Sequence, residues 1–149
     1  MNLIEVETIE LSGPALDWAV LEAEGAPCFV MGDAWPGNSV VDEAAYGGRV
    51  LILNQFGNLI VVDRGWRGEW SPSTNWAQGG PLIDKYCSEV SSRTDFPFAD
   101  GPWGASVTSD PDVFWVAPTP LVAVCRAVVA RKLGRAVKVP AMLVEVAHG

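Results

Sequence analysis

The segment from Trp70 to Gly80 combines hydroxyl, amide and indole side chains with two glycines, and these types can bind a small ligand without covalent chemistry. The hydroxyls and amides donate and accept hydrogen bonds, and the indoles can stack on a flat ring. The segment leads into a helix expected from Pro81, and the first N–H groups of a helix attract anions. We therefore predict a site for a nucleotide-like or other anionic ligand. Its expected residues in this segment are Trp70, Ser71, Ser73, Thr74, Asn75, Trp76, Gln78, Gly79 and Gly80.

An ordinary tight loop uses the same residue types, because Ser, Thr, Asn and Gly also satisfy a loop's own backbone. Under that interpretation Trp76 is a core side chain and the segment only supports the fold. Arg126 adds a second open question, since it interrupts an otherwise apolar helical stretch. Buried arginines are rare unless paired, so Arg126 either faces outward or bonds to a carboxylate or ligand, and we include it among the candidate ligand-binding residues.

No pattern in the sequence identifies catalytic residues, a metal site or a cofactor. The single histidine, His148, stands beside the end of the sequence, where a general base would lack a third group to hold it. The acidic pairs, such as Asp110 and Asp112, are expected to be solvated loop charges, and phosphate-loop glycine patterns are absent. We therefore expect a non-catalytic protein without a cofactor, while an enzyme that acts on a nucleotide stays open.

The net charge of −8, from 18 acidic and ten basic residues, argues against direct nucleic-acid binding, which needs a basic face. Five basic residues do cluster late in the chain, and the last three or four of them favour a helix C-terminus. The five are Arg126, Arg131, Lys132, Arg135 and Lys138. The three cysteines are odd in number and form no CxxC pair, which argues against a disulfide framework and a structural zinc. Without a secretory signal or an apolar run of about 20 residues, we expect a cytoplasmic protein that does not enter a membrane; homo-oligomer formation stays open.

The 149 residues suit a single domain spanning residues 1–149. Apolar periodicity and capping residues predict helices over Pro14–Gly25, Pro81–Glu89 and Pro120–Gly134. Two hairpins are expected, Arg49–Asn54 with Asn58–Asp63, and Gly104–Thr108 with Val113–Ala117, together with short strands at Cys28–Met31 and Val137–Val139. Because the strands come in pairs and do not alternate with helices, the fold class is α+β: antiparallel β-hairpins packed against two or three helices.

Four stretches of the sequence together resemble the phage NinX-like family of tailed phages and prophages. They are Leu-Ser-Gly-Pro-Ala-Leu-Asp-Trp-Ala-Val (Leu11–Val20), Trp-Ser-Pro-Ser-Thr-Asn-Trp-Ala-Gln-Gly-Gly-Pro-Leu-Ile-Asp (Trp70–Asp84), Trp-Gly-Ala (Trp103–Ala105) and Pro-Thr-Pro-Leu-Val-Ala-Val-Cys-Arg-Ala-Val-Val-Ala-Arg-Lys-Leu-Gly (Pro118–Gly134), the last followed by Val-Lys-Val-Pro. The resemblance runs from about residue 10 to residue 140, and the Trp70–Asp84 block is its most specific part. The segment at about 26–65 is longer than the family pattern, so we interpret it as a family-specific insert. The resemblance implies a phage accessory protein in the host cytoplasm and implies no particular reaction.

Two hypotheses follow for the function. The first is a non-catalytic binding module that sequesters a small nucleotide-derived molecule, such as a host signal. The alternative is a protein-interaction factor that docks on a host or phage protein through an acidic, tryptophan-containing surface. In the alternative, the Trp70–Asp84 segment has only a structural role.

Overall fold

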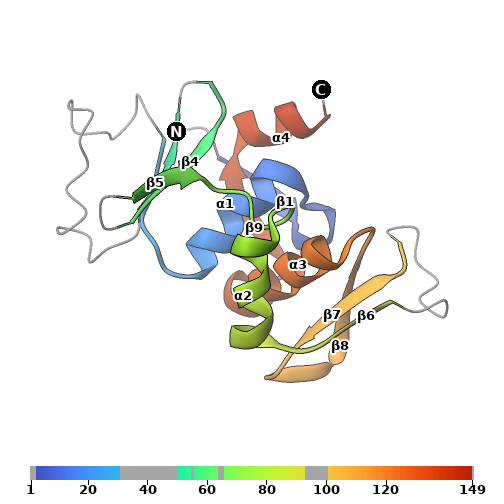
Figure 1. Ribbon diagram of the computed structural model, residues 1–149. Coiled ribbons are helices and arrows are strands. Elements are labelled where there is room, and N and C mark those ends of the chain that lie inside the picture. The colour runs from blue at the N-terminus through green and yellow to red at the C-terminus, as the bar shows by residue number, and fades with distance from the viewer. Residues whose placement is uncertain (1–2, 31–49, 55, 64–65, 93–100, 149) are drawn as a thin grey trace.

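The computed structural model describes residues 3–30, 50–54, 56–63, 66–92 and 101–148 (Figure 1). From the N-terminus, the elements are β1 (Leu3–Glu7), the 3-10 helix η1 (Thr8–Glu10), α1 (Gly13–Ala23), β2 (Cys28–Val30), β3 (Val50–Leu53), β4 (Leu59–Asp63) and β5 (Trp66–Glu69). They continue with α2 (Trp76–Tyr86), β6 (Cys87–Ser92), β7 (Trp103–Val107), β8 (Asp110–Ala117), α3 (Pro120–Leu133), β9 (Ala136–Pro140) and α4 (Ala141–His148). This arrangement confirms the predicted α+β class.

Helix α3 is the central element of the described structure. It packs against α1, α2 and the β6–β7–β8 sheet, and Figure 1 shows that sheet and the β3–β4–β5 strands at opposite sides of the molecule. The helix begins at Thr119, whose Oγ1 accepts a 3.3 Å hydrogen bond from the Val122 N–H, and it ends at Gly134, where φ is 100°. Because neighbours cover α3 on several sides, nearly every residue between Leu121 and Val129 is buried.

Three small sheets surround the helices. Strands β1 and β9 pair antiparallel, β2–β3–β4–β5 form a mixed sheet in which only β2 and β3 run parallel, and β6–β7–β8 form an antiparallel meander. Side chains alternate along β3, so Leu51 and Leu53 belong to the main core while Val50 and Ile52 pack with Val62 in a second cluster. The sheet therefore has apolar contacts on both faces.

Several predicted elements are confirmed. The first hairpin is the β3–β4 pair, and Gly57 in its turn has a φ of 83°. The second hairpin is the β7–β8 pair, and short strands occur near both expected positions, as β2 and β9. Helix α1 ends close to Gly25, which has a φ of 84°, as expected of a C-terminal glycine. Within the expected insert at 26–65, residues 31–49 lie outside the described residues.

Other details of the prediction were wrong. The helix expected at Pro81–Glu89 runs instead from Trp76 to Tyr86, with Pro81 inside it, and β6 follows directly. The expected loop residues Asp110 and Asp112 belong to β8, because the turn is shorter than predicted. The sequence also favours Ser12 as the cap of the first helix; Ser12 does occupy the N-cap position of α1, but its side chain makes no capping hydrogen bond. None of the helices in the described ranges is long and apolar enough to cross a bilayer.

A candidate binding pocket beside helix α2

Trp70 and Ser73, two of the predicted site residues, are held from within the core by Asp17 of α1. The Trp70 indole is buried, and its Nε1 donates a 2.8 Å hydrogen bond to the Asp17 carbonyl. The Ser73 backbone N–H donates a 2.8 Å bond to the Asp17 carboxylate. Burial raises the pKa of Asp17 to about 6, against the lowering effect of the two Ser73 groups, and the charge of Glu69 adds a smaller rise. The first part of the predicted segment is thus buried and held against α1 by these two hydrogen bonds.

The Ser73 hydroxyl lies beside the same carboxylate and helps to lower its pKa. However, Ser73 Oγ is fully buried and forms no hydrogen bond of good geometry with the described part of the chain. The buried position makes this hydroxyl unavailable to a ligand in solvent.

Asn75 is the N-cap of helix α2, and the chain itself occupies the N–H groups of Ala77, Gln78 and Gly79 in the first turn. Asn75 Oδ1 accepts from the Ala77 N–H at 2.9 Å, and the Asn75 carbonyl accepts from Gln78 and Gly79 at 3.1 and 2.8 Å. An anion at these amides would have to displace the Asn75 side chain. These N–H groups, which we expected to bind an anion, therefore already take part in an ordinary helix cap.

The Gln78 side chain ties α2 back to the preceding strand and loop. Its Oε1 accepts a 2.7 Å bond from the Ser71 N–H, and its Nε2 donates a 2.7 Å bond to the Glu69 carbonyl. Gly79 is buried against Pro72, whereas Gly80 has open space at its Cβ position. These contacts keep the helix close to the loop.

The other predicted site residues lie in two different environments. Thr74 and Asn75 are exposed, and Trp76 is 57% exposed, so this indole is not a core side chain. Arg126 is buried in α3, where its Nε donates to the Leu11 carbonyl at 2.9 Å and its Nη1 to the Val116 carbonyl at 2.8 Å. Arg126 therefore does not face outward, and it connects α3 to two other segments.

Beside this segment the structure contains a pocket of about 310 Å³ between the end of α1, strand β4 and α2. Two of the predicted residues, Trp70 and Gln78, line it. The full lining is Glu24, Val61, Asp63, Trp70, Ala77, Gln78, Pro81, Leu82 and Lys85. Apolar side chains and ionisable groups thus share the wall, as in many small-molecule sites.

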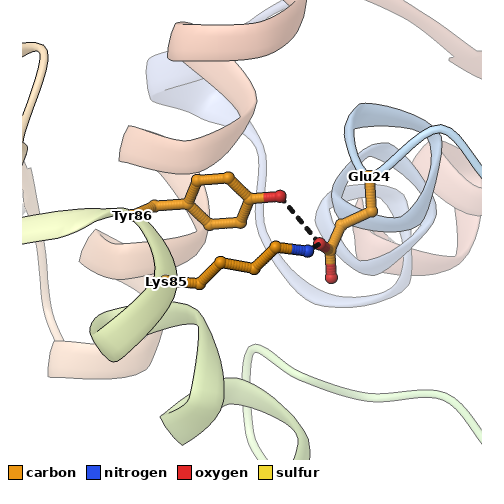
Figure 2. Close-up of polar contacts among 3 residues, drawn as sticks. All are labelled: Glu24, Lys85 and Tyr86. Atoms are coloured by element: carbon orange, nitrogen blue, oxygen red, sulfur yellow. Dashed lines mark hydrogen bonds and ion pairs between the residues drawn. The ribbon is translucent and has the colours of Figure 1, made fainter.

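Glu24 at the end of α1 is bonded to two residues at the end of α2 (Figure 2). Its Oε2 accepts from Lys85 Nζ at 2.7 Å and from the Tyr86 hydroxyl at 2.8 Å. The bond to Glu24 raises the pKa of Lys85, while burial is the main reason that the pKa of Tyr86 is raised. Lys85 and Lys132 also lie over the Tyr86 ring, with Nζ atoms 5.2 and 5.5 Å from its centroid. Of these four residues, Glu24 and Lys85 line the pocket, whereas Tyr86 and Lys132 do not.

The pocket wall carries two carboxylates, Glu24 and Asp63, and one ammonium, Lys85. It can donate and accept hydrogen bonds, but it has excess negative charge. No group of three or more His, Cys, Asp or Glu side chains in the described ranges is placed to hold a metal ion. The three thiols all have raised pKa values, because each is buried or partly buried.

Sequence reasoning missed six of the lining residues. They are Glu24, Val61, Asp63, Ala77, Pro81 and Lys85, with Leu82 expected only as part of an apolar helical stripe. No local spacing links positions on α1, β4 and α2, so no motif indicated this pocket. The ion pair between Glu24 and Lys85 depends on the tertiary structure, because it forms only where the ends of α1 and α2 meet.

The fold and the site together define a small α+β protein with a polar pocket beside α2. The chain belongs to the phage family described as Bacteriophage P22, NinX, whose pattern matches residues 7–132. The matched range includes the Trp70–Asp84 segment and all the lining residues of the pocket. No curated protein matches the chain.

Proposed function

We propose that this NinX-family protein is a non-catalytic binding module that holds a small nucleotide-like ligand in the pocket beside α2. The observation that carries the proposal is the pocket itself, which combines apolar walls with ionisable groups in about 310 Å³. That volume lies at the lower end of the roughly 300–1,000 Å³ typical of small-molecule sites. A ligand of nucleoside size suits it better than a larger one.

The charges of the wall narrow the class of ligand. Glu24 and Asp63 accept hydrogen bonds from amino or hydroxyl groups, and they repel a ligand with several negative charges. A single phosphate would have to compete with Glu24 for Lys85, which Glu24 already binds at 2.7 Å. The pocket therefore favours the nucleoside portion of a nucleotide-like molecule over its phosphates.

The phage origin of the family motivates the biological part of the proposal. A binding module without catalysis acts by lowering the free concentration of its ligand. We infer that the protein works in the host cytoplasm, where it sequesters a small host molecule such as a signal derived from a nucleotide. This part depends on the pocket and on the family membership together.

Isothermal titration calorimetry of the full chain against nucleosides, nucleoside monophosphates and cyclic nucleotides tests the proposal. We expect at least one nucleoside-containing compound to bind, and the variant Ala77→Phe to weaken that binding by about tenfold or more, because the added ring enters the pocket. The matched control is Thr74→Phe, which adds a ring at an exposed position that does not line the pocket. The proposal would be overturned if no compound of the panel bound to the folded protein, or if the Ala77→Phe and Thr74→Phe variants bound the ligand equally well.

A second candidate function rests on the exposure of large apolar side chains. Trp76 is 57% exposed at the start of α2, and Phe56 is 76% exposed in the β3–β4 turn. Exposed tryptophans often supply much of the binding energy at protein interfaces. This exposure supports the alternative proposal, docking on a host or phage protein through an acidic, tryptophan-containing surface that includes Trp76.

The two candidate functions are separated by Trp76→Ala, because Trp76 does not line the pocket. In the docking interpretation, a partner captured stoichiometrically from infected host lysate is lost with this variant and retained with Ala77→Phe. In the small-ligand interpretation, Trp76→Ala leaves ligand affinity unchanged.

A further inference from the structure

A second groove, of about 260 Å³, lies between the C-terminal part of α3 and the β7–β8 hairpin. Figure 1 shows this hairpin beside α3, away from strands β4 and β5. Its lining residues are Val107, Asp110, Val113, Trp115, Ala127, Ala130, Arg131 and Arg135. It shares no lining residue with the pocket beside α2.

Two arginines give this groove a charge opposite to that of the whole protein. Arg131 and Arg135 are exposed and line the groove with one carboxylate, Asp110, in a chain of net charge −8. Neither guanidinium forms an ion pair or hydrogen bond with the described residues. Guanidinium groups bind phosphate oxygens in a planar, two-pronged geometry, and two of them on one wall suit a phosphate monoester.

The simpler role for these arginines is to cap the carbonyls at the end of α3. In the structure, Thr8 binds the two carbonyls that directly follow α3. Thr8 Oγ1 donates to the Gly134 carbonyl at 2.7 Å, and the Thr8 N–H donates to the Arg135 carbonyl at 2.8 Å. Thr8 thus binds the segment that follows α3, while neither arginine side chain hydrogen-bonds to a carbonyl of the described residues, so both can reach a ligand.

The rest of the wall suits a flat ring next to the phosphate. Val113 and Trp115 of β8 both line the groove; Val113 is 38% exposed and Trp115 is half-buried. The small side chains of Ala127 and Ala130 form the opposite wall. Asp110 can accept a hydrogen bond from a hydroxyl or amino group, and its charge disfavours a second phosphate.

From this combination we propose that the groove is a second ligand site, which binds a nucleoside monophosphate. The arginines hold the phosphate, and Trp115 contacts the base. This inference stands independently of the pocket beside α2, because the residues and the favoured charge of the ligand differ.

Calorimetry and methyl NMR of the full chain with adenosine monophosphate test the inference, with adenosine and inorganic phosphate as separate arms. We expect the monophosphate to bind more tightly than either part and to shift the Ala127 and Ala130 methyl signals. The double variant Arg131→Gln/Arg135→Gln should weaken binding by about tenfold or more, because two charge-assisted contacts are lost. The control Lys132→Gln removes one adjacent charge that does not line the groove, and it should bind like wild type.

Three outcomes would overturn the inference. The first is no binding of the monophosphate to folded protein, and the second is equal binding by the double variant and the Lys132→Gln control. The third is binding that is lost in Ala77→Phe but kept in the double arginine variant, which would place the nucleotide beside α2. Methyl shifts in wild-type protein locate the ligand even if a variant does not fold.

Discussion

Asp17 accepts a 2.8 Å hydrogen bond from the backbone N–H of Ser73, which lies 56 residues later in the chain. The same residue accepts the Trp70 indole N–H through its backbone carbonyl. One position on α1 therefore holds two points of the segment that precedes α2. Because α2 forms one wall of the pocket, this buried carboxylate indirectly sets the pocket's shape.

The first prediction concerns pH. Asp17 has an ordinary pKa of 3.8 when exposed and a pKa of about 6 in the fold, where burial disfavours its charge. The folded state thus binds the proton more tightly, so the contribution of Asp17 to stability is present at low pH and is lost as pH rises through about 6. The difference corresponds to roughly 3 kcal/mol. Relative to Asp17→Asn, which cannot titrate, wild type should lose stability between pH 4 and pH 7, as measured by urea unfolding.

Other carboxylates also titrate in this range, so the comparison is between the two proteins at each pH. Asparagine keeps an oxygen that can accept the Ser73 N–H, which makes it a close structural match. Parallel pH profiles of unfolding free energy for wild type and Asp17→Asn would contradict the raised pKa.

The second prediction uses two neighbouring glycines. A Cβ on Gly79 would lie 2.3 Å from the Pro72 carbonyl oxygen and 2.8 Å from Leu121 Cδ2, whereas a Cβ on Gly80 meets nothing within 4 Å. Gly79→Ala should therefore destabilise the protein by about 1–3 kcal/mol, as overpacking does. Gly80→Ala should stabilise it by about 0.5–1 kcal/mol, because alanine is the better helix former. Thermal unfolding checks both, and similar shifts in the two variants would contradict the close approach of α2 to Pro72.

The sequence correctly predicted the elements that are determined by neighbouring residues, such as helix ends and hairpin turns. Thr119 and Gly134 mark the two ends of α3, and Gly57 marks a hairpin turn, because capping and positive φ depend on neighbouring residues alone. The pairing of β1 with β9 joins opposite ends of the chain. No local pattern indicates such a pairing.

The start of α2 shows why part of the site could not be predicted. Two glycines and a proline indicate a loop followed by a helix at Pro81, yet the helix begins five residues earlier, at Trp76. Gly79 is present there because the helix approaches Pro72 closely, which is a tertiary contact. Of the residues predicted for the site, Trp70 and Gln78 line the pocket, while its charged residues come from α1, β4 and the end of α2.

The third prediction concerns Arg126, whose guanidinium joins α3 to the Leu11 and Val116 carbonyls. Arg126→Met keeps much of the apolar length but leaves both buried carbonyls without this donor, at about 1–3 kcal/mol for each unsatisfied group. The exposed Arg131 is the control, and Arg131→Met should change stability by no more than about 0.5 kcal/mol. Chemical denaturation measures both. Equal stabilities of the two variants would show that the buried guanidinium contributes little to the fold.

The last prediction concerns thiol reactivity. Burial raises the pKa of Cys87 to about 11, and burial with the nearby charge of Glu22 raises that of Cys28 to about 12. Cys125 is fully buried, and its pKa is also raised. Reaction requires the thiolate, so near neutral pH the folded protein should react with iodoacetamide at least about a hundredfold more slowly than the same protein in denaturant. Mass spectrometry of alkylated peptides measures each cysteine separately. Rapid labelling of Cys87, which lies directly after α2, would show that the α2–β6 junction opens readily.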